Sequence, residues 1–129
     1  MESAIRVLVV DDEEVILGVI SRMLTHAGFV VAQAKSAREA LALLAANDGF
    51  DAVVTDVVMP ETDGHALGRL IAERHPALPI IYISAYPKDD VFRRGAPDDS
   101  APFLPKPFAP EQLIALIERL ISARGHRVS

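Results

Sequence analysis

The side chains best suited to metal or phosphate chemistry in this 129-residue chain each follow a short apolar segment. The segments and their following residues are 5–10 with Asp11 and Asp12, 52–55 with Asp56, 80–83 with Ser84, and 103–105 with Lys106. Carboxylate oxygens are ligands that Mg²⁺ prefers, and a carboxylate can also act as a nucleophile that forms an acyl phosphate. A hydroxyl and an ammonium can stabilise a phosphoryl group by hydrogen bonding and charge. These residue types therefore predict metal-assisted phosphoryl chemistry.

Convergence of these side chains depends on the elements that carry them. Apolar segments of this length, each followed by a helix-period segment, are typical of parallel strands buried on both faces. In an open α/β sheet, ligands bind at the carboxyl ends of the strands, so the three carboxylates, the hydroxyl and the ammonium should share one shallow pocket. Two carboxylates ~5 Å apart repel by about 3 kcal/mol at an effective dielectric near 20, so such a pocket favours a divalent cation.

Each residue also has a simpler explanation when taken singly. Acidic residues 11–14 would complement the dipole of a following helix, and Asp56 could be a turn residue. Ser84 could cap a helix, and Lys106 could be a solvated loop lysine. None of these explanations predicts that all of them fall at strand ends. The four histidines show no paired ligand spacing, which argues against a histidine metal site.

Five strand–helix alternations follow one another without an internal domain boundary, which predicts a single domain over residues 1–129. The first helix is expected over residues 13–27, ending before Gly28, and the second strand over residues 30–34. Ser36 and Glu39 form a capping-box pattern, with Glu39 reaching back, for a helix that ends near residue 46.

The second half of the chain continues the alternation. A helix is expected over residues 63–74, and the last helix should begin at Pro110. Its apolar face is expected to hold Leu113, Ile114, Ile117, Leu120 and Ile121. Residues 87–102 leave room only for a shortened or irregular fourth helix. Right-handed crossovers then give an α/β, three-layer, doubly wound sandwich.

Composition limits the classes of function. The net charge of −5 argues against direct nucleic-acid binding by the domain, and the absence of cysteine leaves no disulfide or thiolate chemistry. The apolar segments are of strand length, so neither a signal peptide nor membrane insertion is expected.

Four motifs in order resemble the response-regulator receiver domains of two-component signalling, over about residues 4–122, with 123–129 as a C-terminal tail. The motifs are Val9-Val10-Asp11-Asp12-Glu13, Thr55-Asp56-Val57-Val58-Met59-Pro60 with Asp63-Gly64, Ser84-Ala85, and Leu104-Pro105-Lys106-Pro107-Phe108. The resemblance implies a flavodoxin-like (βα)5 fold with the sheet order 2-1-3-4-5. Typical receivers have a full helix after the fourth strand. Residues 87–102 leave room only for a short one, and in this they resemble the receivers attached to hybrid histidine kinases.

The resemblance also implies a function. Asp56 would accept a phosphoryl group from a phosphohistidine on a histidine kinase or a histidine phosphotransfer protein. Asp11, Asp12, Asp56 and the Val58 carbonyl would surround Mg²⁺, with Mn²⁺ as an alternative ion. Lys106 would neutralise the phosphoryl oxygens, and Ser84 and Phe103 would form the switch pair. The resemblance further implies a cytoplasmic signalling module rather than an enzyme.

The expected partner surface lies on the first helix and on the loop after Lys106. Its candidate residues are Val15, Ile16, Val19, Arg22, Met23, Pro107 and Phe108. Output is expected through an unidentified downstream protein, with the domain as a monomer or weak dimer. In the family, the residues two beyond the phosphoacceptor and two beyond the switch hydroxyl flank the path of the hydrolytic water; here they are Val58 and Tyr86.

Other classes fit the sequence less well. A flavin-binding domain of this fold would need a Gly/Ser/Thr-rich loop where residues 11–14 are acidic, and a P-loop enzyme would need a Gly-rich Lys-Ser/Thr motif. An aspartyl-nucleophile phosphatase would need a second acid two positions beyond its nucleophile, where this chain has Val58. A non-phosphorylated pseudo-receiver scaffold remains the alternative, ranked lower because all five site residues are present.

Overall fold

The computed structural model describes residues 4–47, 49–57, 64–84 and 102–123. At its centre is a sheet of five parallel strands in the order β2-β1-β3-β4-β5. The strands are β1 (Arg6–Val10), β2 (Val30–Ala34), β3 (Ala52–Asp56), β4 (Ile80–Ser84) and β5 (Phe103–Pro105). The predicted sheet and its order are confirmed, which places β1 and β3 side by side at the centre.

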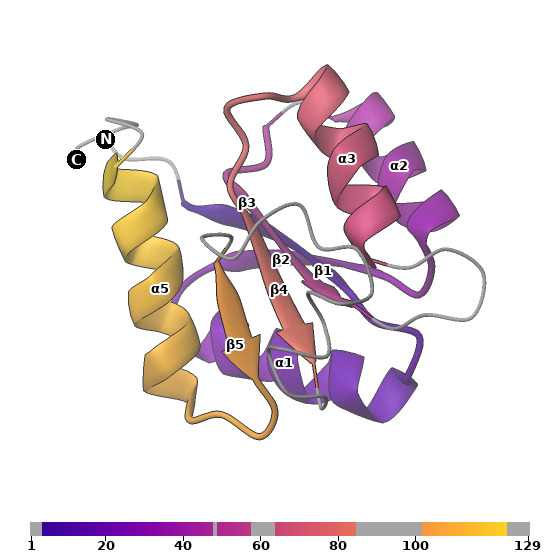
Figure 1. The fold of residues 1–129 in the computed structure, drawn as a ribbon. Coiled ribbons are helices and arrows are strands. Elements are labelled where there is room, and N and C mark those ends of the chain that lie inside the picture. Colours follow the sequence, from indigo (N-terminus) through magenta and orange to yellow (C-terminus); the bar gives the residue numbers. More distant parts are fainter. Residues whose placement is uncertain (1–3, 48, 58–63, 85–101, 124–129) are drawn as a thin grey trace.

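Helices cover both faces of this sheet. The described helices are α1 (Glu14–His26), α2 (Ala37–Ala46), α3 (Gly64–Arg74) and α5 (Pro110–Ala123). α1 and α5 lie on one face, and α2 and α3 lie on the other (Figure 1). The three-layer, flavodoxin-like sandwich is therefore confirmed. The predicted irregular fourth helix falls outside the described residues except for Pro102, and the predicted tail does so except for Ala123, which ends α5.

Local sequence signals explain where several helices begin and end. Gly28 follows α1 and has a φ of +100°. Glycine suits this position because it adopts the left-handed conformation without strain. At α2, the Ser36 hydroxyl accepts the Glu39 N–H at 3.1 Å, as predicted. The Glu39 carboxylate instead accepts the N–H of Lys35 at 2.9 Å, so the return bond of the capping box reaches one residue farther back.

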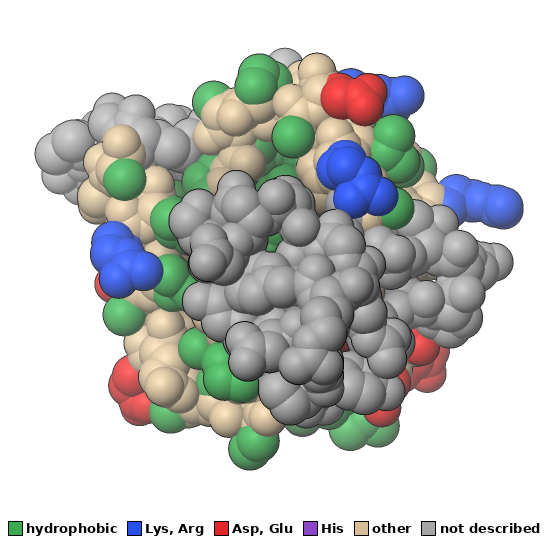
Figure 2. All heavy atoms as spheres, viewed as in Figure 1, with side chains coloured by type: hydrophobic (Ala, Val, Ile, Leu, Met, Phe, Trp, Pro, Cys, Tyr) green, Lys and Arg blue, Asp and Glu red, His purple; other side chains and the backbone are tan. Residues whose placement is uncertain are grey.

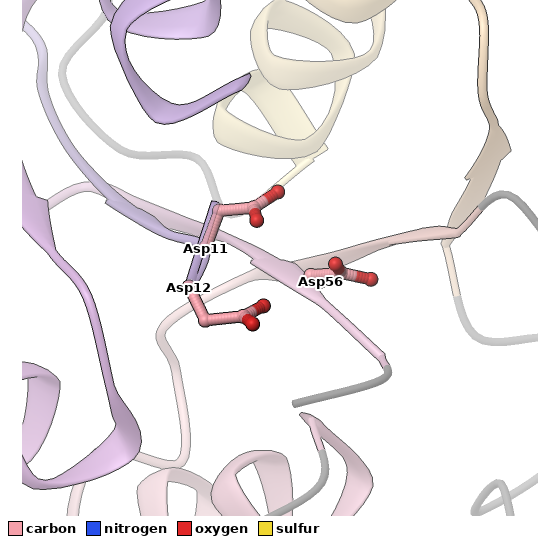
Figure 3. Close-up of side chains that lie close together, drawn as sticks. All are labelled: Asp11, Asp12 and Asp56. Atoms are coloured by element: carbon pink, nitrogen blue, oxygen red, sulfur yellow. The ribbon is translucent and has the colours of Figure 1, made fainter. Parts of the chain in front are cut away.

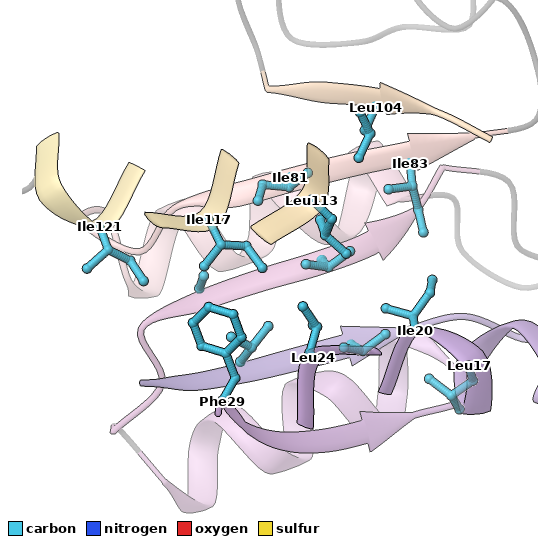
Figure 4. Packing of buried hydrophobic residues seen from close by; sticks show 14 residues of the cluster. Leu17, Ile20, Leu24, Phe29, Ile81, Ile83, Leu104, Leu113, Ile117 and Ile121 are labelled. Carbon is cyan, nitrogen blue, oxygen red and sulfur yellow. The ribbon is translucent and has the colours of Figure 1, made fainter. Parts of the chain in front are cut away.

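Two apolar clusters hold the layers together. On one face, α1 contributes Leu17, Ile20 and Leu24, and α5 contributes Leu113, Ile117 and Ile121 (Figure 4). Ile114 and Leu120, also predicted for the core face of the last helix, are partly buried against this cluster. On the other face, Leu44 of α2 and Leu67 and Ile71 of α3 pack on the sheet. Burial on both faces matches the continuous apolar sequence of the central strands.

The helices are also informative about membranes. Within the described ranges, none of them combines the length and the apolar character needed to cross a bilayer.

Ser21 of α1 offers a test of the packing. Its side chain is buried, and among the described residues its Oγ has no hydrogen-bond partner. Burying a hydroxyl without a partner costs about 1–3 kcal/mol, and alanine is also the better helix former. Ser21→Ala should therefore raise the free energy of unfolding by about 1 kcal/mol, measured by urea denaturation. Thr25→Ala, at an exposed position of the same helix, controls for helix propensity; a loss of stability in Ser21→Ala would contradict the packing described.

Candidate functional site

The carboxylates of Asp11, Asp12 and Asp56 meet at the carboxyl edge of the sheet. Asp11 and Asp12 follow β1, and Asp56 is the last residue of the neighbouring strand β3. One oxygen from each side chain lies within 4.8 Å of the others. Figure 3 shows the three side chains extending toward the same region beyond the strand ends. The predicted convergence of these acids is found.

Burial and hydrogen bonds fix the acid from β1. Asp11 is fully buried and Asp56 is 6% exposed. The backbone N–H of Asp11 donates to the Ala34 carbonyl at 3.1 Å, which continues the pairing of β1 with β2 by one residue. The Asp11 Oδ1 atom accepts the N–H of Glu13 at 2.9 Å, so one of its oxygens is held at the start of α1. The chain therefore orients the carboxylate of Asp11 before any ligand arrives.

Lys106 completes the charge arrangement from the other side. Its Nζ atom lies 3.2 Å from Oδ2 of Asp11 and 3.3 Å from Oδ2 of Asp56. Its backbone N–H donates to the Ser84 carbonyl at 2.7 Å, which ties the end of β5 to the end of β4. Burial lowers the pKa of the Lys106 ammonium, but the charges of Asp56 and Asp11 outweigh burial and raise the pKa above its usual value. Lys106 is therefore a cation at neutral pH.

Ser84 and Phe103 lie where the sequence places them. Ser84 is the last residue of β4 and is fully buried, and Phe103 begins β5 and is partly buried against Val57 and Tyr82. The carbonyl of Val58, predicted as a metal ligand, lies outside the described residues. Ser84 is thus at the same sheet edge as the three acids, and Phe103 is paired with Tyr82, two residues before Ser84.

The donor set fits a hard divalent cation. Among the described residues, three carboxylates face a single ammonium, which leaves an excess of negative charge in a mostly buried setting. Carboxylate oxygens are hard ligands, and Mg²⁺ usually keeps several waters while binding a few carboxylates. Asp11, Asp12 and Asp56 can therefore supply such an ion with protein ligands.

The predicted partner surface is only partly exposed. Val15 is 77% exposed and Val19 is 42% exposed, and Arg22 and Pro107 are also exposed. The remaining candidates, Ile16, Met23 and Phe108, are partly buried and pack against the core. The accessible part of this surface is therefore formed by the two valines and Arg22 on α1, and by Pro107 beyond Lys106.

A salt bridge beside the site was missed by the sequence reasoning. Lys35, directly after β2, donates a hydrogen bond to the Glu14 carboxylate at the start of α1. This hydrogen bond and the charge of Lys35 lower the pKa of Glu14. Both side chains are largely exposed, so the pair contributes little to stability. The sequence feature that could have revealed this salt bridge is the position of Lys35, directly after the strand that pairs with β1.

A pocket of about 200 Å³ lies elsewhere, near the ends of α2 and α3. Its lining residues are Leu44, Asn47, Phe50, His75, Pro76, Ala77 and Leu78. None of them belongs to the acidic cluster or to a strand's carboxyl end. The chemistry predicted from the sequence therefore belongs to the shallow acidic edge and not to this pocket.

Comparisons with known proteins give the family of this chain. The family model of the response regulator receiver domain matches residues 7–118. The response regulator MprA of Mycolicibacterium vanbaalenii is 40% identical over 119 residues, which cover 91% of this chain and 50% of MprA. The sensor kinase CckA of Brucella abortus is 39% identical over 117 residues, which cover 89% of this chain and 12% of CckA.

A solved structure extends the agreement to the fold. The crystal structure of a response regulator receiver protein from Sinorhizobium medicae matches with a TM-score of 0.83 at 35% identity, covering 95% of this chain and 98% of that one. The chain spans half or less of the length of these two curated relatives. The family model and the solved structure lead to the same conclusion, and the chain belongs to the response-regulator receiver domains of two-component signalling.

Proposed function

We propose that this receiver domain accepts a phosphoryl group on Asp56 from a phosphohistidine of a histidine kinase or a histidine phosphotransfer protein. The observation that carries the proposal is the contact of Lys106 with both Asp11 and Asp56, in a cluster that also includes Asp12. A cation fixed beside a buried carboxylate, with two further acids as metal ligands, provides the charges that phosphoryl transfer needs.

The transfer step uses few residues. A carboxylate oxygen of Asp56 attacks phosphorus, the bond from phosphorus to the histidine nitrogen breaks, and the imidazole leaves with that electron pair. Lys106 neutralises the phosphoryl oxygens, and the Ser84 hydroxyl donates a hydrogen bond to one of them. Asp11, Asp12, Asp56 and the Val58 carbonyl would hold Mg²⁺ or Mn²⁺, which supplies charge neutralisation when bound. Ser84 and Phe103 would then switch the interaction with a downstream protein.

The alternative is a pseudo-receiver that acts as a scaffold without phosphorylation. The two readings differ in covalent chemistry, because only a phosphoacceptor gains mass from a small phosphodonor. We expect phosphoryl incorporation from acetyl phosphate in Mg²⁺, with loss of incorporation when the metal is chelated. No incorporation at any donor concentration would favour the scaffold.

Partner docking can be separated from phosphoryl chemistry. Val15 and Val19 are exposed on α1, whereas acetyl phosphate needs no protein surface. Val15→Glu and Val19→Glu should each slow transfer from a histidine kinase by about tenfold, equal to 1.4 kcal/mol of lost docking, while acetyl phosphate labelling persists.

The matched control for this experiment is Val30→Glu. Val30 is 49% exposed but belongs to the edge strand β2, at the opposite end from the acids. The Val30→Glu variant should leave the rate of transfer from the histidine kinase unchanged. Equal loss in both labelling assays for the α1 variants would indicate damage to the fold and contradict the docking surface.

A further inference from the structure

Tyr82 of β4 reaches from the sheet to the backbone of α3. The side chain is buried, with 5% of its surface exposed. A Cβ built on Gly68 of α3 would overlap the Tyr82 hydroxyl and lie 3.0 Å from Cζ and 3.4 Å from Cε1. The phenol therefore occupies the space that a side chain at position 68 would fill. Glycine is required here because the helix backbone and the ring approach closely.

The same tyrosine lies among the residues of the proposed switch. In the sheet register, Tyr82 is paired with Thr55 on one side and with Phe103 on the other. Val57, which directly follows Asp56, forms a buried cluster with Tyr82, and Phe103 packs against this cluster. Residues two apart on a strand project from the same face, so Tyr82 and Ser84 share a face of β4. Tyr82 thus touches both the segment after the phosphoacceptor and the aromatic switch residue.

We propose that Tyr82 is a positioning residue that carries the phosphorylation state of Asp56 to α3 through Gly68. The proposal rests on the function proposed above. Protein interiors are close-packed, so a shift of Val57 or Phe103 must be absorbed by the neighbouring ring. At its far end, the ring meets helix backbone rather than a flexible side chain, which leaves α3 as the element that responds.

The exposed surface of α3 carries charged side chains that would move if the helix moved. Arg69, Glu73 and Arg74 are exposed on the helix. Figure 2 shows charged side chains of both signs over the region that α3 occupies in Figure 1. A displacement of α3 would move these charges relative to the rest of the surface. A downstream protein with complementary charges could then distinguish the two phosphorylation states.

The contact itself is tested first by paired alanine substitutions. Gly68→Ala should lower the melting temperature, because the new Cβ collides with Tyr82, and adding Tyr82→Phe should restore most of the loss. Gly18→Ala on α1 is the matched control, since a Cβ there meets nothing within 4 Å. It should raise the melting temperature by removing a helical glycine. An equal change of melting temperature in Gly68→Ala and Gly18→Ala would overturn the proposal.

The transmission is tested by amide NMR with excess acetyl phosphate and Mg²⁺, with intact mass measured on the same samples. Phosphorylation should shift the amides of Gly68 and Arg69 in the wild type. In Tyr82→Leu, whose side chain cannot reach α3, Asp56 should still be labelled while these shifts fall to less than half. Tyr82→Phe keeps the ring and should retain a larger part of them, which provides a folded intermediate case.

The outcomes separate this inference from the proposed function. Absence of any mass gain in the wild type would refute phosphoacceptance itself. Mass gain without a shift of the α3 amides would overturn only the role of Tyr82. Equal shifts in wild type and in a labelled Tyr82→Leu protein would do the same, because α3 would then respond by another route.

Discussion

Asp12→Asn and Asp56→Asn should each raise the melting temperature of the metal-free protein. In the described part of the chain, three carboxylates with oxygens within 4.8 Å of one another face one ammonium, so removing one negative charge relieves repulsion. A pair ~5 Å apart costs about 3 kcal/mol at an effective dielectric near 20, and part of this gain should appear as stability. Each kcal/mol corresponds to roughly 4 °C for a domain of this size.

Magnesium should reverse this order of stability. An ion that binds only the folded state stabilises it by about 2.7 kcal/mol at 100 times its dissociation constant. The wild type, which keeps all three carboxylates, should gain most, and both variants should gain much less. Thermal denaturation with and without Mg²⁺ measures both effects. Glu118→Gln, which removes one exposed charge from α5, is the control and should behave like the wild type. Equal Mg²⁺ effects on wild type, Asp12→Asn and Asp56→Asn would show that the acids do not share an ion.

The acyl phosphate on Asp56 should be long-lived. Hydrolysis needs a water positioned for in-line attack, and assistance by a general base contributes typically ~10²-fold or more. The residues expected to flank this water are Val58 and Tyr86, both outside the described part of the structure. Valine offers no hydrogen bond, and a phenol that is neutral at pH 7 is a poor base. We therefore expect autodephosphorylation to be slow.

Decay after removal of the phosphodonor measures this lifetime. The double variant Val58→Asn/Tyr86→Glu supplies an amide and a carboxylate and should lose its phosphoryl group ~10²-fold faster than the wild type. Each single variant should fall between the two. Decay of the wild type at the rate of the double variant would contradict the role given to these positions.

Features encoded by short segments were predictable from sequence. The strands could be located because their residues are continuously apolar, and burial of β3 along its full length explains this pattern. The carboxyl ends of parallel strands meet at one edge, which brought Asp11 and Asp56 together in the prediction as in the structure. Gly28 and Ser36 likewise marked helix ends because their roles depend only on local backbone geometry.

Features set by packing between distant segments were not predictable. The fit of Tyr82 against Gly68 depends on the spacing of β4 and α3, which no local pattern specifies. The exposed pair of Lys35 and Glu14 depends on the path of the chain after β2. Helical periodicity also could not tell which apolar residues of α1 are exposed and which are buried. In the structure, Val15 is exposed while Ile16 packs against the core.

The most direct test of the account is the intact mass of the wild type and of Asp56→Asn after incubation with Mg²⁺ and acetyl phosphate. Asp56 lies in reach of Lys106 and of the two other acids, so we predict the gain of a single phosphoryl group by the wild type. We predict no gain by Asp56→Asn, because an amide cannot form the acyl phosphate. Modification that persists in Asp56→Asn, or a wild type that stays unmodified, would contradict the assignment of Asp56 as the phosphoacceptor.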